Sequence, residues 1–514
     1  MMRQDVRDLT FLDPANLIWL THGAVIAGIS IHVIMKRPAT GVALAWLILI
    51  ALLPFVGPLL YFLIGNRRIS GRRSRGFQHL RQVYESDADQ TDGDIAPEID
   101  WSDLSPSANG IHHLGLVTAG SSLTRDNAFE LLSGTDEILD RIARDIDGAK
   151  TSILMEFYIW NAGGKADEVL AALIRAAERG VSCRVLIDAL GARPWWKTDQ
   201  PQRLRDAGVE LREALPVGLL RSAVGRTDLR LHRKVVVVDQ AIAWTGSMNL
   251  VDPAFFKQDA GVGEWVDAMV RLEGGVVTSL AAVMIGDWSL ETGEKPLILT
   301  PRPQLVLTPA TTADALAGDG GDDAPTPDGQ GPGAAMQVVA SGPGETGDGL
   351  LLMLIALVSA ATSELVLTTP YFVPDESLLR ALRAASGRGV KVSLILPEKV
   401  DSLLSRYASR SYYDELLEMG VNVYLYKGGL LHTKSITADG ALAMFGTVNL
   451  DMRSLWLNYE VALFVYDQDF ARTLRNLQET YISDSHLLER SNWSARPFLE
   501  RFVENVLRLS GPLL

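Results

Sequence analysis

Cysteine is almost absent from this chain: Cys183 is the only one in 514 residues. An intrachain disulfide is therefore excluded, and a zinc site with thiolate ligands is disfavoured. A basic excess is missing too, since 48 lysines and arginines stand against 62 aspartates and glutamates, for a formal net charge of −14. Nucleic-acid binders usually carry a basic surface, so the charge balance argues against that class.

Apolar residues, by contrast, make up 47% of the chain, and its length predicts two or three domains. Two long apolar runs open the sequence, from Leu17 to Met35 and from Gly41 to Gly65. Each is close to the roughly 20 residues that an α-helix needs to cross a bilayer. The short link "KRPAT" predicts a hairpin with both ends on one side. Pro54 and Pro58 leave open whether the second run spans fully or is re-entrant.

Positive charge gathers directly after this hairpin. The loop inside the hairpin has only Lys36 and Arg37. By the positive-inside rule, the segment after the hairpin and the rest of the chain are expected in the cytoplasm. Arginines so placed can also attract anionic headgroups, at about 1 kcal/mol each. The segment, "NRRISGRRSR", has five of them: Arg67, Arg68, Arg72, Arg73 and Arg75.

The remainder of the chain is a repeat with a period of roughly 200 residues, interrupted by a Gly/Pro/Asp-rich linker that should be disordered. In each block an apolar run ("KTSILMEFYIW" or "TSELVLTTPYFV") precedes a helical segment, which ends at glycine and enters another apolar run. This alternation predicts an α/β fold with mainly parallel or mixed sheets flanked by helices. The expected divisions are a hairpin at 1–66, a basic then acidic linker at 67–115, a first half at 116–300, a disordered linker at 301–340 and a second half at 341–514.

Each block contains one strand that begins with histidine and lysine, "LHRKVVVVD" in the first and "LHTKSITAD" in the second. Alternate residues of a strand face the same side, so His232 projects with Lys234 and His432 with Lys434. Together they suit displacement at a phosphodiester: one imidazole attacks phosphorus, the other protonates the leaving alkoxide, and the lysines neutralise the non-bridging oxygens. The turns that follow offer four side chains to hydrogen-bond phosphate oxygens: Ser247, Asn249, Thr447 and Asn449.

Four carboxylates accompany the two motifs. Asp267 in "EWVDAMVRL" and Glu460 in "LNYEVALFV" occupy matching positions, and we expect them to orient the two imidazoles through their far nitrogens. Asp239 and Asp439 complete the motifs as candidate catalytic residues, although each ends its strand, where anchoring a turn near the site is the more natural role. No metal or cofactor is expected, since the lysines and imidazoles already supply positive charge.

A single His-x-Lys pair on a strand is more often an ordinary polar pair than a site, but its repetition with the same downstream Gly, Asn and carboxylate favours function. The repeated pattern H-x-K-x4-D followed by G-[ST]-x-N resembles the phospholipase D superfamily. The hairpin and the tracts "GSMNLVDPAFFKQDAGVGEWVD", "TTPYFVPDESLL" and "FGTVNLDMRSLWLNYEV" resemble the bacterial cardiolipin synthases that join two phosphatidylglycerols. The resemblance covers nearly the whole chain. Thr447 stands where many superfamily members have serine, and it keeps the hydroxyl.

The resemblance implies two pseudo-symmetric phospholipase D-like domains after a transmembrane hairpin, in a bacterial inner membrane with the catalytic domains facing the cytoplasm. It implies that His232 attacks one phosphatidylglycerol and releases glycerol, and that a phosphohistidine forms. His432 then acts first as acid and next as base for the hydroxyl of a second phosphatidylglycerol. The spacing itself does not decide which histidine is the nucleophile. Phosphatidylglycerol and cardiolipin in the bilayer are the implied partners, with no nucleic acid, and a homo-oligomer stays open.

Other functions compete with this one. A phospholipase D that hydrolyses its lipid, or a phosphatidyltransferase with another alcohol or donor, uses the same residues. A nuclease of the superfamily is disfavoured by the hairpin and the acidic balance. An inactive membrane scaffold is disfavoured because both motifs keep their histidine and lysine. Water and an alcohol need the same base, so the sequence does not settle the acceptor.

Overall fold

The computed structural model describes residues 14–36, 40–53, 55–61, 104–216, 228–295, 333–344 and 347–509. The chain divides into two compact units, one of residues 1–70 with 218–227 and one of residues 71–217 with 228–514. The arginine-rich segment, the acidic linker before residue 104 and most of the Gly/Pro/Asp-rich linker lie outside the described residues.

The smaller unit contains the helices α1 (Pro14–Met35), α2 (Thr40–Leu52) and α3 (Val56–Leu60). Helix α1 packs against both α2 and α3. The second apolar run is interrupted between α2 and α3, where the sequence places Pro54, because proline cannot continue the helical hydrogen bonding. Within the described residues, no helix combines the length and apolarity that crossing a membrane requires.

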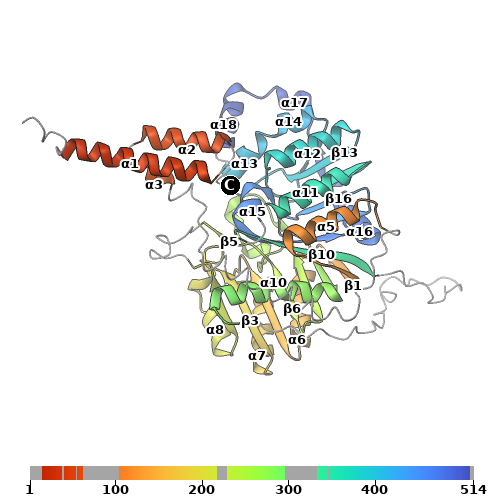
Figure 1. Ribbon diagram of the computed structural model, residues 1–514. Coiled ribbons are helices and arrows are strands. Elements are labelled where there is room, and N and C mark those ends of the chain that lie inside the picture. Colours follow the sequence, from red (N-terminus) through yellow and green to blue (C-terminus); the bar gives the residue numbers. More distant parts are fainter. Residues whose placement is uncertain are drawn as a thin grey trace, which may run out of the picture. The chain divides into compact units, whose positions relative to one another are not determined.

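The larger unit is built on one continuous sheet in which the two blocks follow the same strand order and meet where β1 pairs with β10 antiparallel (Figure 1). The first block runs β1 (Leu123–Leu132), β9 (Met269–Glu273), β7 (Ile242–Gly246), β6 (Val235–Val238), β2 (Ser152–Phe157), β3 (Ser182–Asp188) and β4 (Glu210–Ala214). The second runs β10 (Ala334–Ser341), β19 (Asn458–Val465), β17 (Leu442–Gly446), β16 (Ser435–Ala438), β11 (Glu364–Thr368), β13 (Lys391–Pro397), β14 (Asn422–Tyr426) and β20 (Ser485–Leu487).

The sheet is mixed rather than mainly parallel. Along the strand order given above, β2–β3–β4 and β11–β13–β14 pair in parallel, and the motif strand β6 is antiparallel to both of its neighbours, β2 and β7. The physical reason is the turn after β6, where Asp239 and Gln240 have φ values of 52° and 51° and send the chain straight back as a hairpin. A parallel partner needs a crossover of a dozen or more residues, which this turn does not have.

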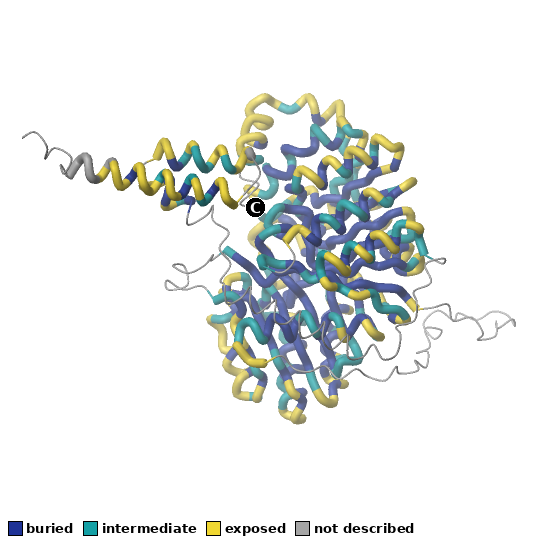
Figure 2. The backbone as a smooth tube through the Cα atoms, viewed as in Figure 1, coloured by how far each residue is buried: buried dark blue, intermediate teal, exposed yellow. Residues whose placement is uncertain are grey.

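Helices cover both faces of each block, which explains why the motif strands are apolar throughout. Val236 and Val238 belong to the core under α6 (Thr135–Gly148) and α7 (Lys165–Glu178). Val235 and Val237 belong to the core on the opposite face, under α10 (Gly275–Thr292). Figure 2 shows the strands buried along most of their length. A strand between two helical layers has no wet face, so it loses the polar alternation.

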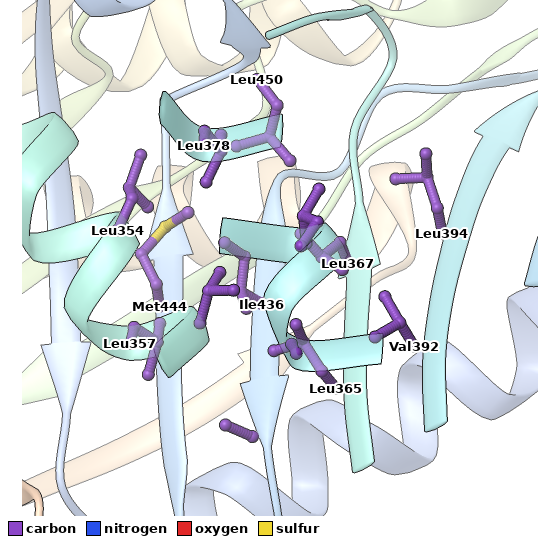
Figure 3. Close-up of a cluster of buried hydrophobic side chains, with 14 of the residues drawn as sticks. Leu354, Leu357, Leu365, Leu367, Leu378, Val392, Leu394, Ile436, Met444 and Leu450 are labelled. Atoms are coloured by element: carbon purple, nitrogen blue, oxygen red, sulfur yellow. The ribbon is translucent and has the colours of Figure 1, made fainter. Parts of the chain in front are cut away.

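The second block has the same construction, with α11 (Gly349–Ala360) and α12 (Glu376–Gly387) on one face and α16 (Gln468–Ser483) packed on β16 and β17. Its core is drawn in Figure 3. Helix and strand side chains interdigitate there, and they include Leu354, Leu357, Leu365, Leu367, Leu378, Val392, Leu394, Ile436, Met444 and Leu450.

Two segments near the boundaries expected from the sequence pack differently from that expectation. Helix α5 (Ala108–Ala119), in the span expected as linker and the start of the first half, packs on α11, and its Ala108 and Ile111 join the core of the second block. Strand β10 begins at Ala334, inside the span expected to be a disordered linker. Both segments carry apolar side chains that are buried only when the whole fold has assembled. The average composition of a linker does not reveal these few positions.

Candidate active site

Each histidine is held by a short strand pair that joins the two halves. Strand β5 (Arg230–Leu231) pairs in parallel with β19, and the His232 N–H donates to the Tyr459 carbonyl at 2.9 Å. Strand β15 (Leu430–Leu431) pairs in parallel with β8 (Trp265–Val266), and the His432 N–H donates to the Val266 carbonyl at 2.8 Å. The backbone before each histidine is therefore tied to the backbone before the other half's carboxylate.

The orienting carboxylates are consequently crossed between the halves. His232 Nδ1 lies 2.8 Å from Glu460 Oε2, and His432 Nδ1 lies 2.7 Å from Asp267 Oδ1. All four side chains are buried. A carboxylate on Nδ1 favours the tautomer with the proton on that nitrogen and leaves Nε2 with its lone pair available. Each half supplies one imidazole and orients the imidazole of the other, so neither half has a complete site.

Burial sets the protonation of this pair of dyads. It lowers the pKa of His232 and of His432 to about 4, against the smaller upward pull of their carboxylates. Burial raises the pKa of Asp267 and Glu460, but the facing histidine and the buried lysine outweigh it, and the net pKa of both carboxyls is lowered. Neutral imidazoles beside ionised carboxylates are the state a nucleophile and a general base need at neutral pH.

The two lysines follow the histidines in the segments between β5 and β6 and between β15 and β16. Lys234 Nζ donates to the His232 carbonyl at 2.6 Å, and Lys434 Nζ donates to the His432 carbonyl at 2.5 Å. Both lysines are fully buried. Burial lowers the pKa of Lys234 to about 8 and that of Lys434 to about 7. A phosphate that binds beside the two lysines favours their charged ammonium form. The charge of both lysines therefore depends on whether an anionic substrate is bound.

The turn hydroxyls contact the carboxylates rather than open space. Ser247 Oγ donates to Asp267 Oδ1 at 2.5 Å, and Thr447 Oγ1 donates to Glu460 Oε2 at 2.6 Å. The sequence predicts these hydroxyls on substrate phosphate, whereas in the structure they support the orienting acids. The reason is that the turns after β7 and β17 lie against the segments that carry Asp267 and Glu460 in the same half.

The two asparagines differ from one another. Asn249 Oδ1 accepts the Ile159 N–H at 3.2 Å and so fixes a neighbouring loop. Asn449 is buried, and its Oδ1 has no hydrogen-bond partner in the described part of the chain. Of the four turn side chains, Asn449 is the one with a buried atom that lacks a hydrogen-bond partner among the described residues, and that atom is an acceptor.

Asp239 and Asp439 lie at the far end of the motif strands from the histidines, roughly 20 Å of extended chain away. The Asp239 carboxylate accepts N–H bonds from Lys150, Thr151 and Ser152 at 2.7–2.9 Å. Asp439 accepts the matching bonds at the start of β11. These bonds lower the pKa of both carboxyls despite burial, which raises it. The structure does not bring this pair to the site: the contacts anchor turns.

Replacing Asp239 by alanine is therefore expected to cost stability and spare chemistry. It leaves the turn N–H groups before β2 unpaired, a loss of about 1–3 kcal/mol in the free energy of unfolding. Thermal unfolding measures this, with Asp199→Ala as the control because the Asp199 side chain is 79% exposed. The rate per folded molecule should stay within a few-fold of wild type. A folded variant that has lost all turnover contradicts the anchoring role.

Three further side chains lie beside the histidines and the orienting acids, and the motifs in the sequence did not identify them. The Trp265 ring lies 4.4 Å from the His432 ring, and the Tyr158 ring lies 5.1 Å from the His232 ring. Asn458 Nδ2 donates to Glu460 Oε1 at 3.1 Å. Trp265 and Asn458 each stand two residues before an orienting carboxylate, on the same strand face, so their spacing is the signal that could have found them.

The lysine pKa values predict a pH dependence. A lysine stabilises phosphate only while protonated, so kcat/KM, which reports the free enzyme, should fall as pH rises through about 7 to about 8. The value of kcat, which reports the complex, should hold to higher pH because bound phosphate raises the pKa of both lysines. Initial rates at fixed ionic strength from pH 5 to 10 measure both. Identical basic limbs in kcat and kcat/KM contradict this assignment.

Two His–carboxylate dyads and two buried lysines, contributed by the two halves of a duplicated α/β fold, define a two-histidine phosphodiester-transferring enzyme. Among the described residues, no cluster of His, Cys, Asp and Glu is placed to hold a metal ion.

Known proteins match this arrangement. The family described as "Cardiolipin synthase, PLD-like domain" matches residues 142–264 and 354–481, and the family described as "Phospholipase_D-nuclease N-terminal" matches residues 24–66. The cardiolipin synthase A of Erwinia tasmaniensis is 43% identical over 491 residues, covering 95% of this chain and 96% of that protein. That of Klebsiella pneumoniae (strain 342) is 42% identical over 507 residues, covering 98% of this chain and all of that protein.

The chain belongs to the cardiolipin synthase family, within the phospholipase D-like proteins. A solved structure shares the fold: that of phosphatidylserine synthase from Haemophilus influenzae Rd KW20, at 17% identity and a TM-score of 0.58, covers 79% of this chain and 100% of its own.

Proposed function

We propose that the protein is a cardiolipin synthase, which transfers a phosphatidyl group from one phosphatidylglycerol to the hydroxyl of another. Membership of the cardiolipin synthase family over nearly the whole chain supports this reaction. The observation that carries it is the pair of crossed dyads, because two equivalent imidazoles suit an exchange of one phosphodiester for another. The enzyme is a phosphatidyltransferase.

In the first step, His232 Nε2 attacks the phosphorus of the donor, and a phosphohistidine forms as the bond to the headgroup oxygen breaks. His432, which takes up a proton on Nε2 when the anionic phosphate binds beside it, gives that proton to the departing glycerol. In the second step, His432 takes the proton from the terminal hydroxyl of the acceptor, whose oxygen attacks phosphorus and releases His232. Lys234, Lys434 and the Asn449 amide stabilise the charge on the phosphate oxygens.

The N-terminal hairpin supports a membrane location, because both substrates are lipids and the apolar side chains of α1 and α2 are largely exposed. We place the catalytic unit on the cytoplasmic face of a bacterial inner membrane, in line with the arginines that follow the hairpin. Withdrawal from water also protects the phosphohistidine from hydrolysis.

The test is a product analysis with the purified full chain and labelled phosphatidylglycerol in mixed micelles. Cardiolipin and glycerol released in equal amounts support the transferase. Phosphatidic acid with glycerol identifies a hydrolase that uses the same site. No turnover of phosphatidylglycerol, alone or with phosphatidylethanolamine added, removes the cardiolipin assignment and leaves phosphodiester chemistry on another substrate.

A further inference from the structure

The C-terminal helix α18 (Phe498–Arg508) is attached to the catalytic unit by its charged side. Helix α18 packs against α13 (Leu403–Arg410). Glu504 is the buried residue of α18, and its carboxylate accepts from Arg410 Nε at 2.7 Å and from Arg496 Nη2 at 3.0 Å. Arg508 donates to Glu415 at 3.1 Å. An amphipathic helix ordinarily packs on its domain through its apolar stripe, whereas α18 is held there by ion pairs.

The apolar side of α18 faces outward. Phe498 and Phe502, one helical turn apart, have ring centroids 6.2 Å apart. Figure 2 shows the helix exposed along most of its length. Five apolar side chains at helical spacing are open to solvent: Phe498 at 79%, Leu499 at 70%, Phe502 at 54%, Val506 at 46% and Leu509 at 81%. On α13, Leu403 is 69% and Leu404 is 37% exposed.

This apolar face is connected to the active site through α13. Asp401 stands just before α13, and its carboxylate binds the Tyr371 hydroxyl at 2.7 Å and Lys257 Nζ at 2.9 Å. Lys257 Nζ lies 5.4 Å from the centre of the Trp265 ring, and the Trp265 ring contacts the His432 ring at an interplanar angle of 46°. A short run of contacts therefore leads from the apolar face to one of the two imidazoles.

We propose that α18 and the start of α13 form a membrane-docking face that rests in the interface of a lipid bilayer. Exposed Phe and Leu with charge on the opposite side are the composition of helices that lie in that interface. Arg501, exposed on α18, is placed to meet anionic headgroups. Because a run of contacts joins this face to His432, docking holds that side of the catalytic unit close to the lipid phosphates. The inference rests on the proposed function only in that both substrates are lipids.

The test places a fluorescent probe on the face in the full chain reconstituted into phosphatidylglycerol-containing vesicles. Cys183 is buried and its thiol pKa is raised to about 11 by burial, so a cysteine introduced by Phe502→Cys is labelled selectively. Arg472→Cys on α16, where the arginine is 62% exposed, is the control. Lipids with a nitroxide near the headgroup should quench the probe at position 502 at least about twice as strongly as the probe at position 472.

Three outcomes overturn the proposal. Equal quenching at both positions means that α18 stays in water. A blue-shifted probe whose shift grows with protein concentration, with or without lipid, means that a second copy covers the face. A blue shift in dilute, lipid-free detergent means that another segment of the same chain covers it. None of these readouts requires turnover, so each stays interpretable if the proposed reaction is wrong.

A second arm measures the consequence for catalysis. Phe498→Ser with Phe502→Ser removes apolar area from exposed positions that carry no fold contacts of consequence. The KM for phosphatidylglycerol, expressed as mole fraction in vesicles, should rise about 10-fold or more. The kcat/KM for a short-chain phosphatidylglycerol below its micelle concentration should stay at the wild-type value. Equal losses on both substrates mean a structural role and overturn the docking assignment.

Discussion

Replacing either His232 or His432 by alanine is expected to lower phosphatidyl transfer by about 10⁴-fold or more, because nucleophilic attack and proton transfer each lose their group. The double variant should be no slower than the worse single variant, since the two imidazoles act as one unit. Product formation from labelled phosphatidylglycerol measures the loss. His113→Ala is the matched control, because His113 is exposed and away from both dyads.

The two histidines can be told apart with a phosphatidyl ester of p-nitrophenol, whose leaving group needs no acid. His432→Ala should then release one nitrophenolate per enzyme and stop, because His432 is also the base for the second step. The lipid should remain on His232 as an acid-labile adduct, visible by mass spectrometry. His232→Ala should release none. The reverse pattern assigns the nucleophile to His432, and release by both variants contradicts a phosphohistidine.

Replacing Glu460 by glutamine or Asp267 by asparagine is expected to slow transfer by about 10²–10⁴-fold, with the fold intact. The amide keeps the size of each side chain but removes the negative charge that stabilises a protonated or phosphorylated imidazole. The amide can also turn its NH2 group toward the histidine, and a donor at that place no longer fixes the Nδ1–H tautomer. The pKa of each partner histidine should fall further, because its carboxylate is the largest upward influence on it.

The crossed geometry makes a sharper prediction for the same two variants. Glu460 orients His232 and Asp267 orients His432. With the p-nitrophenyl ester, Glu460→Gln should therefore behave like His232→Ala and lose the initial release. Asp267→Asn should behave like His432→Ala and retain it. If each carboxylate instead follows the histidine of its own half, the crossing is contradicted. Ser247→Ala and Thr447→Val, which remove the hydroxyls on the two acids, should give weaker effects of the same two kinds.

Much of the site follows from residue pattern alone. The period-2 alternation of a strand predicts Lys234 beside His232 and Lys434 beside His432. In the structure these residues lie between strands, and each lysine donates to the carbonyl of its histidine. The duplication of the motif, with Asp267 and Glu460 in matching positions, points to a site made of two halves. These features are local or repeat at fixed spacing, so they can be predicted without knowing how the chain packs.

The relative direction of neighbouring strands is harder to predict from the sequence. Continuous apolar strands suggest parallel pairing, but they report only that both faces are covered. The turn at Asp239, with positive φ at two successive residues, decides that β6 runs antiparallel to β7. The assignments of α5 and β10 fail for a related reason, because each depends on contacts that are distant along the chain. Ala108 and Ile111 of α5 join the core of the second block, and Leu123 of β1 pairs with Gln337 of β10.

What the sequence by itself determined is the inventory: two imidazoles, two lysines, two orienting acids and a duplicated α/β frame to hold them. Only the tertiary structure decided the pairing, because β5 joins β19 and β15 joins β8 across the halves, and this crossing places each acid on the other half's histidine. The tertiary structure also shows that Asp239 and Asp439 lie at turns far from the histidines. The hydroxyls of Ser247 and Thr447 lie against the two orienting acids. Hydrogen bonds between residues 165 and 228 positions apart are set by packing of whole domains, which no local spacing encodes.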